Sequence, residues 1–374
     1  MVSQRSFFAF ALAFVLAAII AWNYWPKTVL APPAPVRAAM PIGQPVTIAA
    51  PLGLPAVPVS ADNPPTVETI ALGRKLYYDP ILSADNTISC ATCHHPDKGF
   101  SDGAMFSTGV GGKKGGRNSP TVWNSAYYTV QFWDGRSPSL ENQAEGPVEN
   151  PVEMAHTLKG VEQKLAANPA YVAEFEKAFG PGPITYGMVE KAIASFERTV
   201  ISGNSPFDKF YFGGDKKALS AAAQRGLKVY MDPEKGNCNV CHTIGEKVAL
   251  FMDNKFHNVG VGADTKGELK DQGRYDVTKN EAERGAFKTP SLRNIALTAP
   301  YMHDGSLPTL KDVVDFYIGG GNSNPHRDKQ IHALDFLTRQ ERDDLLAFLE
   351  SLTGETPPDV KAPEKTVAQA QRGK

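Results

Sequence analysis

Two copies of one short motif constrain this chain more than any other feature of its sequence. CATCH at residues 90–94 and CNVCH at residues 238–242 each place two thiols three positions apart and follow them at once with a histidine. This is the attachment pattern of a c-type haem, in which the thiols bond to the two vinyl groups and the histidine binds one face of the iron. The motifs use all four cysteines of the chain, so we predict two covalently bound haems.

Each motif supplies one proximal ligand, His94 for haem iron 1 and His242 for haem iron 2. The thiols that would hold the two porphyrins are Cys90, Cys93, Cys238 and Cys241. A zinc site or a pair of disulfides is the alternative interpretation. A Cys₂His₂ zinc finger needs a second histidine pair at a fixed spacing, which follows neither motif. A redox CxxC pair does not require the trailing histidine.

Composition and the N-terminus bear on location and partners. The 374 residues are 42% hydrophobic, enough for one large or two medium domains, and the net charge of -1 argues against a nucleic-acid partner. Arg5 precedes an apolar run of 16 residues, 7–22, which is short for a membrane span and long for a signal-peptide core. Because haem attachment also needs an exported protein, we predict a periplasmic chain. It would be tethered to the inner membrane by an uncleaved anchor within residues 1–27, with a removed signal peptide as the alternative.

Two segments have no helical or strand period. Residues 28–65 are rich in Pro, Ala and Val, which predicts an extended, semi-rigid linker. Residues 355–374 lack apolar periodicity, which predicts a disordered tail.

The region between these segments contains an internal repeat. GRKLYYDP at 73–80 is echoed by GLKVYMDP at 226–233, an offset of 153, and each copy precedes a haem motif. SPTVWN at 119–124 is echoed by TPSLRN at 289–294, an offset of 170. In the first pair, Asp-Pro is expected to end a helix in each copy.

Each copy also closes with an apolar pattern of helical period, at 189–201 and at 342–352. Long strand patterns are absent from the sequence. We therefore predict a mainly α fold with an N-terminal hydrophobic segment and two cytochrome c-like haem domains related by internal duplication, 66–215 and 216–354.

The offset of 170 indicates how the open faces of the two irons differ. It pairs WDG at 133–135 with HDG at 303–305, and it pairs Pro147 with Tyr317, which lies in a helix-like stretch at 310–318. Proline offers no ligand atom, whereas a tyrosine phenolate is a hard anionic oxygen that favours ferric and higher iron states. We predict Tyr317 as the second ligand of haem iron 2 and an open face on iron 1. A core aromatic residue is the alternative for Tyr317.

Candidates for acid–base chemistry lie close to Pro147. A carboxylate such as Glu153 can take the proton from the bound oxygen of H₂O₂ and return one to the leaving oxygen. Gln143 can hydrogen-bond the peroxide or a water. The alternative is a solvated acidic face made of Glu141, Glu145, Glu149 and Glu153.

On these residues the chain resembles the bacterial di-haem cytochrome c peroxidase superfamily, and within it the MauG-like branch, over about residues 66–354. The resemblance is carried by both CxxCH motifs, FWDGR at 132–136, Gln143, GPV at 146–148, Glu153, TPSLRN at 289–294 and TAPYMHDG at 298–305.

The resemblance implies a role for each of these positions. The first haem would be the peroxidatic one and the second would transfer electrons, with Trp133 as the relay between them. The residues over the open face of the first iron would be Gln143, Pro147 and Glu153. A calcium ion between the domains would be bound by Asn118, Thr298 and the Pro300 carbonyl, since oxygen ligands suit that ion.

Three positions depart from the ordinary pattern of the family. Tyr317 stands where ordinary members have a methionine ligand, and Val110 stands where a loop histidine caps the resting first haem. Both changes indicate a first haem that needs no reductive activation. Gly236 stands where MauG has a surface tryptophan that draws electrons from its protein substrate, which argues against the same substrate here.

We therefore expect an oxidoreductase, a periplasmic di-haem c-type peroxidase that reduces hydrogen peroxide to water through high-valent iron. Electrons would come from a small redox protein and pass through the second haem. One alternative is a MauG-like maturation enzyme that oxidises side chains of a specific protein substrate. The other is a non-catalytic electron-transfer cytochrome, which would gain nothing from an open iron supplied with protons.

Overall fold

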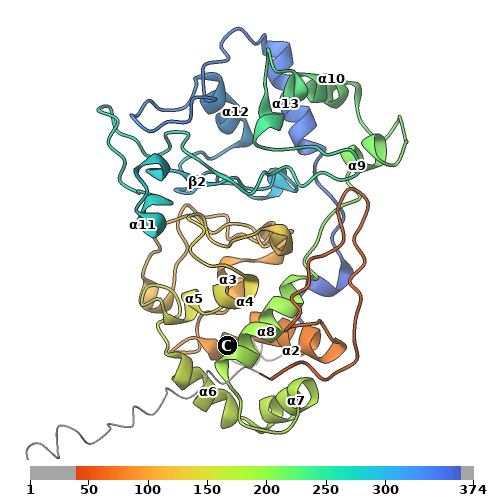
Figure 1. Ribbon diagram of the computed structural model, residues 1–374, viewed down its shortest axis with the longest axis vertical. Coiled ribbons are helices and arrows are strands. Elements are labelled where there is room, and N and C mark those ends of the chain that lie inside the picture. Colours follow the sequence, from red (N-terminus) through yellow and green to blue (C-terminus); the bar gives the residue numbers. More distant parts are fainter. Residues whose placement is uncertain (1–38, 364–374) are drawn as a thin grey trace, which may run out of the picture. The chain divides into compact units, whose positions relative to one another are not determined.

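The computed structural model describes residues 39–363, and helices supply most of its regular structure (Figure 1). The helices of the first half are α2 (Val67–Tyr78), α3 (Cys90–Cys93), α4 (Leu140–Gln143), α5 (Gly146–Glu149), α6 (Leu158–Ala166), α7 (Pro169–Phe179), α8 (Tyr186–Glu197) and α9 (Pro206–Tyr211). Those of the second half are α10 (Ala221–Met231), α11 (Tyr275–Thr278), α12 (Leu310–Ile318) and α13 (Arg339–Glu350). The strands of the described chain are β1 (Phe256–His257) and β2 (Phe287–Lys288), which pair antiparallel. The mainly helical class is confirmed.

Each half is organised around one closely packed pair of helices, α2 with α8 and α10 with α13 (Figure 1). A glycine allows each pair to approach. A Cβ atom on Gly73 would lie 1.8 Å from the Ala192 carbonyl oxygen, and one on Gly226 would lie 1.9 Å from the Asp344 carbonyl oxygen. Both glycines belong to the repeated sequence, so the same close crossing is built twice.

Helix boundaries follow capping residues more closely than they follow the apolar period. Thr338 caps α13 and forms a capping box with Glu341, so the helix begins at Arg339 rather than at the predicted residue 342. The start of α8 follows Thr185, whose side chain makes no capping hydrogen bond, and the helix ends at Glu197, short of the predicted residue 201. The predicted end of α2 at the Asp-Pro pair and the predicted range of α12 are confirmed.

Corresponding positions of the two halves make the same local contacts. The Tyr77 hydroxyl donates to the His94 carbonyl at 3.0 Å, and the Tyr230 hydroxyl donates to the His242 carbonyl. Asn124 and Asn294 both adopt left-handed backbone conformations, with φ of 61° and 59°, and each begins a short 3₁₀ turn. These contacts hold both haem motifs against the first helix of their own half.

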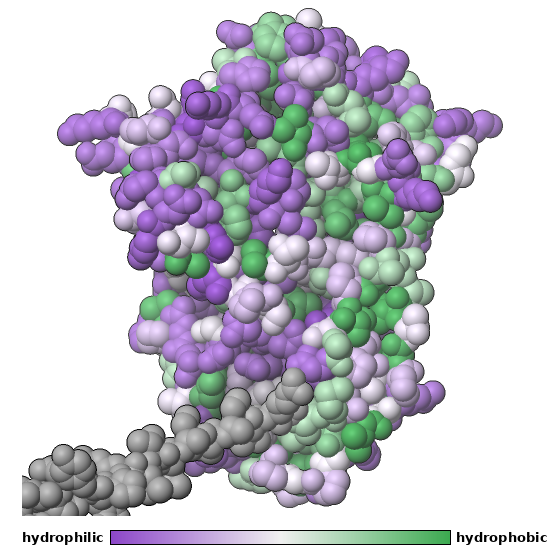
Figure 2. All heavy atoms as spheres, viewed as in Figure 1, coloured by the Kyte–Doolittle hydropathy of each residue, from purple (hydrophilic) through white to green (hydrophobic). Residues whose placement is uncertain are grey.

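The described part of the predicted linker, residues 39–65, is extended and lies against the body of the protein (Figure 1). The Gly53 carbonyl accepts hydrogen bonds from the Arg293 side chain at 2.8 Å and from the Ala249 amide at 2.9 Å, and Leu54 is buried. Figure 2 shows apolar residues gathered along the side on which this segment runs. The segment is therefore part of the packed structure and is not a spacer.

Residues 355–363 differ from the predicted disordered tail. Val360 is fully buried, and its carbonyl accepts a hydrogen bond from the Tyr78 hydroxyl at 2.6 Å. The Lys361 carbonyl accepts another from Arg74. The chain thus returns to the first half after α13, a long-range contact that composition does not reveal. Residues 364–374 lie outside the described residues.

The predicted anchor, residues 1–27, also lies outside the part of the chain that the structure describes. Within residues 39–363, no helix is long and apolar enough to span a bilayer.

Candidate functional site

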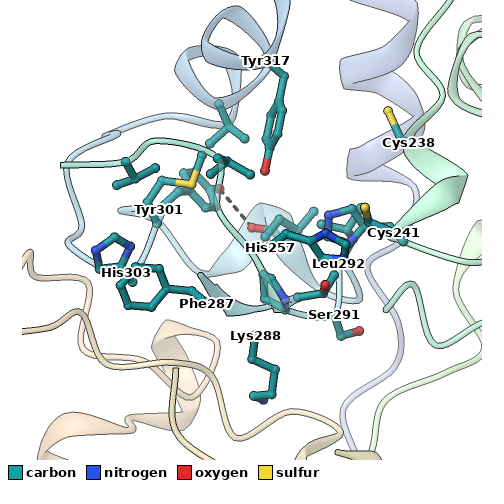
Figure 3. A pocket seen from close by; sticks show the side chains of 18 of the residues that line it. Cys238, Cys241, His257, Phe287, Lys288, Ser291, Leu292, Tyr301, His303 and Tyr317 are labelled. Carbon is teal, nitrogen blue, oxygen red and sulfur yellow. Dashed lines mark hydrogen bonds between the residues drawn. The ribbon is translucent and has the colours of Figure 1, made fainter. Parts of the chain in front are cut away.

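A cavity of about 300 Å³ lies beside the second CxxCH motif (Figure 3). Cys238, Cys241 and His242 line it from one side, and Tyr317 enters it from α12 with its hydroxyl directed inward. Apolar side chains of α12 and α13 complete its walls: Leu310, Val313, Val314, Ile318, Leu345 and Leu349. An apolar slot with thiols, an imidazole and a phenol at its edges suits a covalently attached haem.

Both motif histidines are oriented by a backbone carbonyl. His242 Nδ1 lies 2.9 Å from the Phe251 carbonyl oxygen. His94 Nδ1 lies 3.3 Å from the Phe100 carbonyl oxygen and 3.1 Å from the Ser119 hydroxyl. Burial lowers the pKa of each histidine, which favours the neutral imidazole that binds a metal. A partner on Nδ1 leaves Nε2 for the iron.

The four cysteines are free thiols in the structure, which excludes the disulfide alternative. Burial raises the pKa of the Cys238 thiol to about 12 and raises that of Cys90 further. Burial and the two nearby thiols also raise the pKa of the Tyr317 hydroxyl. The residues predicted for the second haem, Cys238, Cys241, His242 and Tyr317, therefore line one cavity whose donors fit the group.

The residues predicted to act on peroxide come from adjacent elements near the first motif. Gln143 ends α4, and Pro147 lies in α5, where its carbonyl accepts the Met154 amide at 3.1 Å. Glu153 follows in the next turn, and its charge contributes to the raised pKa of the Cys93 thiol, behind burial and Asp102.

Glu153 is partly buried, and its carboxyl group has a perturbed pKa. Burial raises the pKa of its carboxyl group, while a hydrogen bond from Asn150 Nδ2, at 2.6 Å, and the charge of Arg136 lower it. Of the four glutamates in the alternative acidic face, Glu149 is exposed and Glu141 pairs with Arg198 at 2.7 Å. Glu153 therefore differs from the exposed Glu149 and from the ion-paired Glu141, whereas Glu145 is also partly buried.

The loop that contains Val110 packs onto this turn. The Val110 amide donates to the Glu153 carbonyl at 2.8 Å, and a Cβ atom on Gly109 would lie 2.2 Å from the Val152 carbonyl oxygen. The glycine allows the loop to lie close to the backbone of Glu153. The apolar Val110 side chain offers no iron ligand from this loop.

Trp133 is held by both halves of the molecule. Its indole Nε1 donates to the Asn118 carbonyl at 2.9 Å, and its own carbonyl accepts the amide of Lys288, in β2, at 2.8 Å. The next residue, Asp134, accepts hydrogen bonds from Arg117 at 2.6 Å and from Arg136 at 3.0 Å. Trp133 also lines the cavity of the second motif, which agrees with a position between the two haem sites.

The three predicted calcium ligands, Asn118, Thr298 and Pro300, line this same cavity. The Asn118 Nδ2 group donates to the Ala104 carbonyl at 2.9 Å, so its amide oxygen is the atom available to a cation. Amide and carbonyl oxygens are donors that calcium accepts.

Two polar features of the second half were not predicted. His257 lies between two carboxylates, with Nδ1 2.6 Å from Asp328 and Nε2 3.0 Å from Asp253. Contact with Cys241 and with these carboxylates raises the pKa of His257 to about 10. The other feature is Lys288, a buried lysine on the cavity wall. Asp253 lies only four residues before His257, but Asp328 and the Tyr128 ring under Lys288 are distant in sequence, so no local pattern reveals either arrangement.

Comparison with known proteins agrees with this arrangement. A family model described as di-haem cytochrome c peroxidase matches residues 67–217. The methylamine utilization protein MauG of Methylorubrum extorquens is 41% identical over 300 residues, which cover 80% of this chain and 82% of that protein. The cytochrome c551 peroxidase of Pseudomonas aeruginosa is 40% identical over 76% of this chain and 79% of its own length.

The chain belongs to the di-haem cytochrome c peroxidase family. A solved structure of a MauG-like protein associated with microbial copper homeostasis is also similar, at 35% identity and a TM-score of 0.75, covering 84% of this chain and 98% of that one. Members of this family are oxidoreductases, and the family implies two c-type haems, one for each motif. The zinc alternative for the two motifs is thereby excluded.

Proposed function

We propose that this di-haem protein is a periplasmic peroxidase that reduces hydrogen peroxide to water with electrons from a redox protein partner. Each turnover would take two electrons and two protons and release two waters. The observation that carries the proposal is the half-buried Glu153 beside Pro147, because a carboxyl group of raised pKa next to an open iron can accept and return a proton.

The bound iron would supply the redox chemistry, and the protein's own residues would control access and protons. Pro147 offers no ligand atom and would leave room for peroxide, while Gln143 would orient it by a hydrogen bond. Glu153 would take a proton from the proximal oxygen of H₂O₂ and return it to the oxygen that leaves as water. Trp133, bonded to both halves, would carry electrons from the second site to the first.

Three further assignments belong to this proposal. Tyr317 would be the second ligand of haem iron 2, and calcium would bind Asn118, Thr298 and Pro300 between the halves. The two halves would be copies of one ancestral unit, an inference supported by the matched contacts of Tyr77 with His94 and of Tyr230 with His242.

A MauG-like maturation activity is the second candidate, favoured by Tyr317 and by Val110. A peroxide assay with a small reduced cytochrome as donor separates the two. Fast oxidation of two cytochromes per peroxide supports the peroxidase. Peroxide reduction that occurs only with a specific protein, whose side chains are oxidised, contradicts it and supports maturation.

A further inference from the structure

Lys288 is a buried cation that has no counter-ion among the described residues. It ends β2 and is 8% exposed, and its ammonium lies 3.0 Å from the centroid of the Tyr128 ring. Within residues 39–363, no carboxylate forms an ion pair with it. Burial lowers its pKa, and no neighbouring acid opposes that shift.

Such a group implies a negative partner that the polypeptide does not supply. Burying an ammonium without compensation is strongly unfavourable, and the face of an aromatic ring compensates only in part. Buried ion pairs elsewhere in the protein are complete: the guanidinium of Arg293, 1% exposed, pairs with Asp208 at 2.9 Å. Lys288 therefore differs from the buried Arg293, which has its counter-ion among the described residues.

The position of Lys288 identifies the chemistry of the missing partner. The lysine lines the same cavity as Cys238, His242 and Tyr317, and Figure 3 shows it leaving β2 in a different direction from Phe287. A haem attached at this motif would bring its own carboxylates, the two propionates. A propionate is an anion of the kind that a buried ammonium requires.

The repeat places Lys288 at the contact between the halves, at a position that corresponds to a proposed calcium ligand of the first copy. At the offset of 170, Lys288 corresponds to Asn118, and the two residues make reciprocal bonds. The Asn118 amide donates to the His303 carbonyl at 2.7 Å, and the Lys288 amide donates to the Trp133 carbonyl at 2.8 Å. His303 and Trp133 are themselves counterparts at this offset. Tyr128, under the ammonium, likewise corresponds to Thr298.

We propose that Lys288 is the fixed counter-ion of a propionate of the second haem. Its ammonium would occupy, in the second copy, the position that corresponds to the proposed calcium site of the first copy. One side of the contact between the halves would then use an exchangeable cation and the other a cation built into the chain. The proposal rests on the haem of the second motif and does not depend on peroxidase activity.

The test is a spectroelectrochemical titration of the purified di-haem protein, which gives a midpoint potential for each haem. A positive charge beside a haem favours the reduced iron, so Lys288→Met and Lys288→Gln should both lower the potential of the second haem. Lys288→Arg keeps the charge and should stay near wild type. In the neutral variants the propionate should also bind protons more tightly, so the pH-dependent step of this potential should move to higher pH.

Lys279→Met is a matched control, because Lys279 also faces an aromatic ring, Tyr275 at 5.4 Å, but is exposed. It should leave both potentials unchanged. Covalent haem content after acid–acetone extraction verifies that each variant carries both haems. An unchanged second-haem potential in both neutral variants, or a shift confined to the first haem, would overturn the proposal.

Discussion

At the scale of single residues, the proposed proton transfer at the first haem site would depend on the balance of effects on the pKa of Glu153. Burial raises the pKa of its carboxyl group, whereas the hydrogen bond from Asn150 and the charge of Arg136 lower it. A general base must be ionised to accept a proton, and a general acid must be protonated to return it. A pKa displaced upward brings both states closer to the pH at which the enzyme works.

Glu153→Gln removes this proton exchange while keeping the size and polarity of the side chain. We expect both haems to remain bound and the rate of reaction with H₂O₂ to fall by about 10²-fold or more, the usual scale of general acid–base catalysis. Stopped-flow spectra after mixing with peroxide measure this rate. A wild-type rate would remove Glu153 from the mechanism.

Asn150→Ala tests the same balance through pH. The Asn150 Nδ2 group donates to the Glu153 carboxylate and stabilises its charged form, so its loss should raise the pKa of Glu153 further. In a plot of the peroxide reaction rate against pH, the rate should fall on the acidic side as the base becomes protonated. This fall should occur at higher pH in the variant. A fall at the same pH in both proteins would contradict its assignment to Glu153.

At the scale of elements, each haem motif is held by a helix pair whose crossing depends on one glycine. Gly73 and Gly226 are in contact with the backbone of the partner helix, and no side-chain movement can relieve a clash with a carbonyl oxygen. Each helix pair therefore has little room for a side chain at this glycine.

Gly226→Ala should loosen the packing of α10 on α13. Overpacking a close contact typically costs about 1–3 kcal/mol, so the free energy of unfolding should fall. The haem at the second motif should then be less protected from solvent. Gly116→Ala is the control, since a Cβ atom there would meet no neighbour within 4 Å. Denaturant unfolding of the two variants compares them, and equal stability would show that the crossing is not tight.

Local signals in the sequence predict these elements well, but the sequence does not reveal the long-range contacts. The CxxCH motifs and the Asp79-Pro80 helix stop are short-range features, which a single sequence displays. The packing of residues 39–65 and of Val360 depends on partners hundreds of residues away, so composition alone predicted a linker and a disordered tail. His257 and Lys288 were missed for the same reason, because their significance comes from Asp328, Tyr128 and the cavity.

At the scale of the whole molecule, hydrogen bonds cross the contact between the halves at Trp133, the proposed relay between the two haem sites. The Asn118 carbonyl accepts a hydrogen bond from the Trp133 indole, and the Lys288 amide donates one to the Trp133 carbonyl. Arg274 Nη1, from the second half, donates to the Asp134 carbonyl at 2.9 Å and to the Gly135 carbonyl at 2.8 Å. The proposed calcium ligands also line the cavity between these elements.

Removal of calcium should therefore change the environment of the haems. Chelation should change the haem spectra and lower the peroxide activity, and added calcium should restore both, because metal binding stabilises the conformation of its ligands. Asn118→Ala should remove the response to chelator. Purified protein without calcium, whose spectra ignore the chelator, would count against the site.

The most direct test of the account is the addition of H₂O₂ to the fully ferric protein. A Tyr317 phenolate favours ferric and higher iron states, and Val110 supplies no ligand to cap the first haem. The Soret band should therefore change at once without prior reduction, and Tyr317→Met should push the protein toward needing a reduced start. If the ferric wild type does not react until one haem is reduced, Tyr317 is not the ligand we propose and the protein works as an ordinary member of its family.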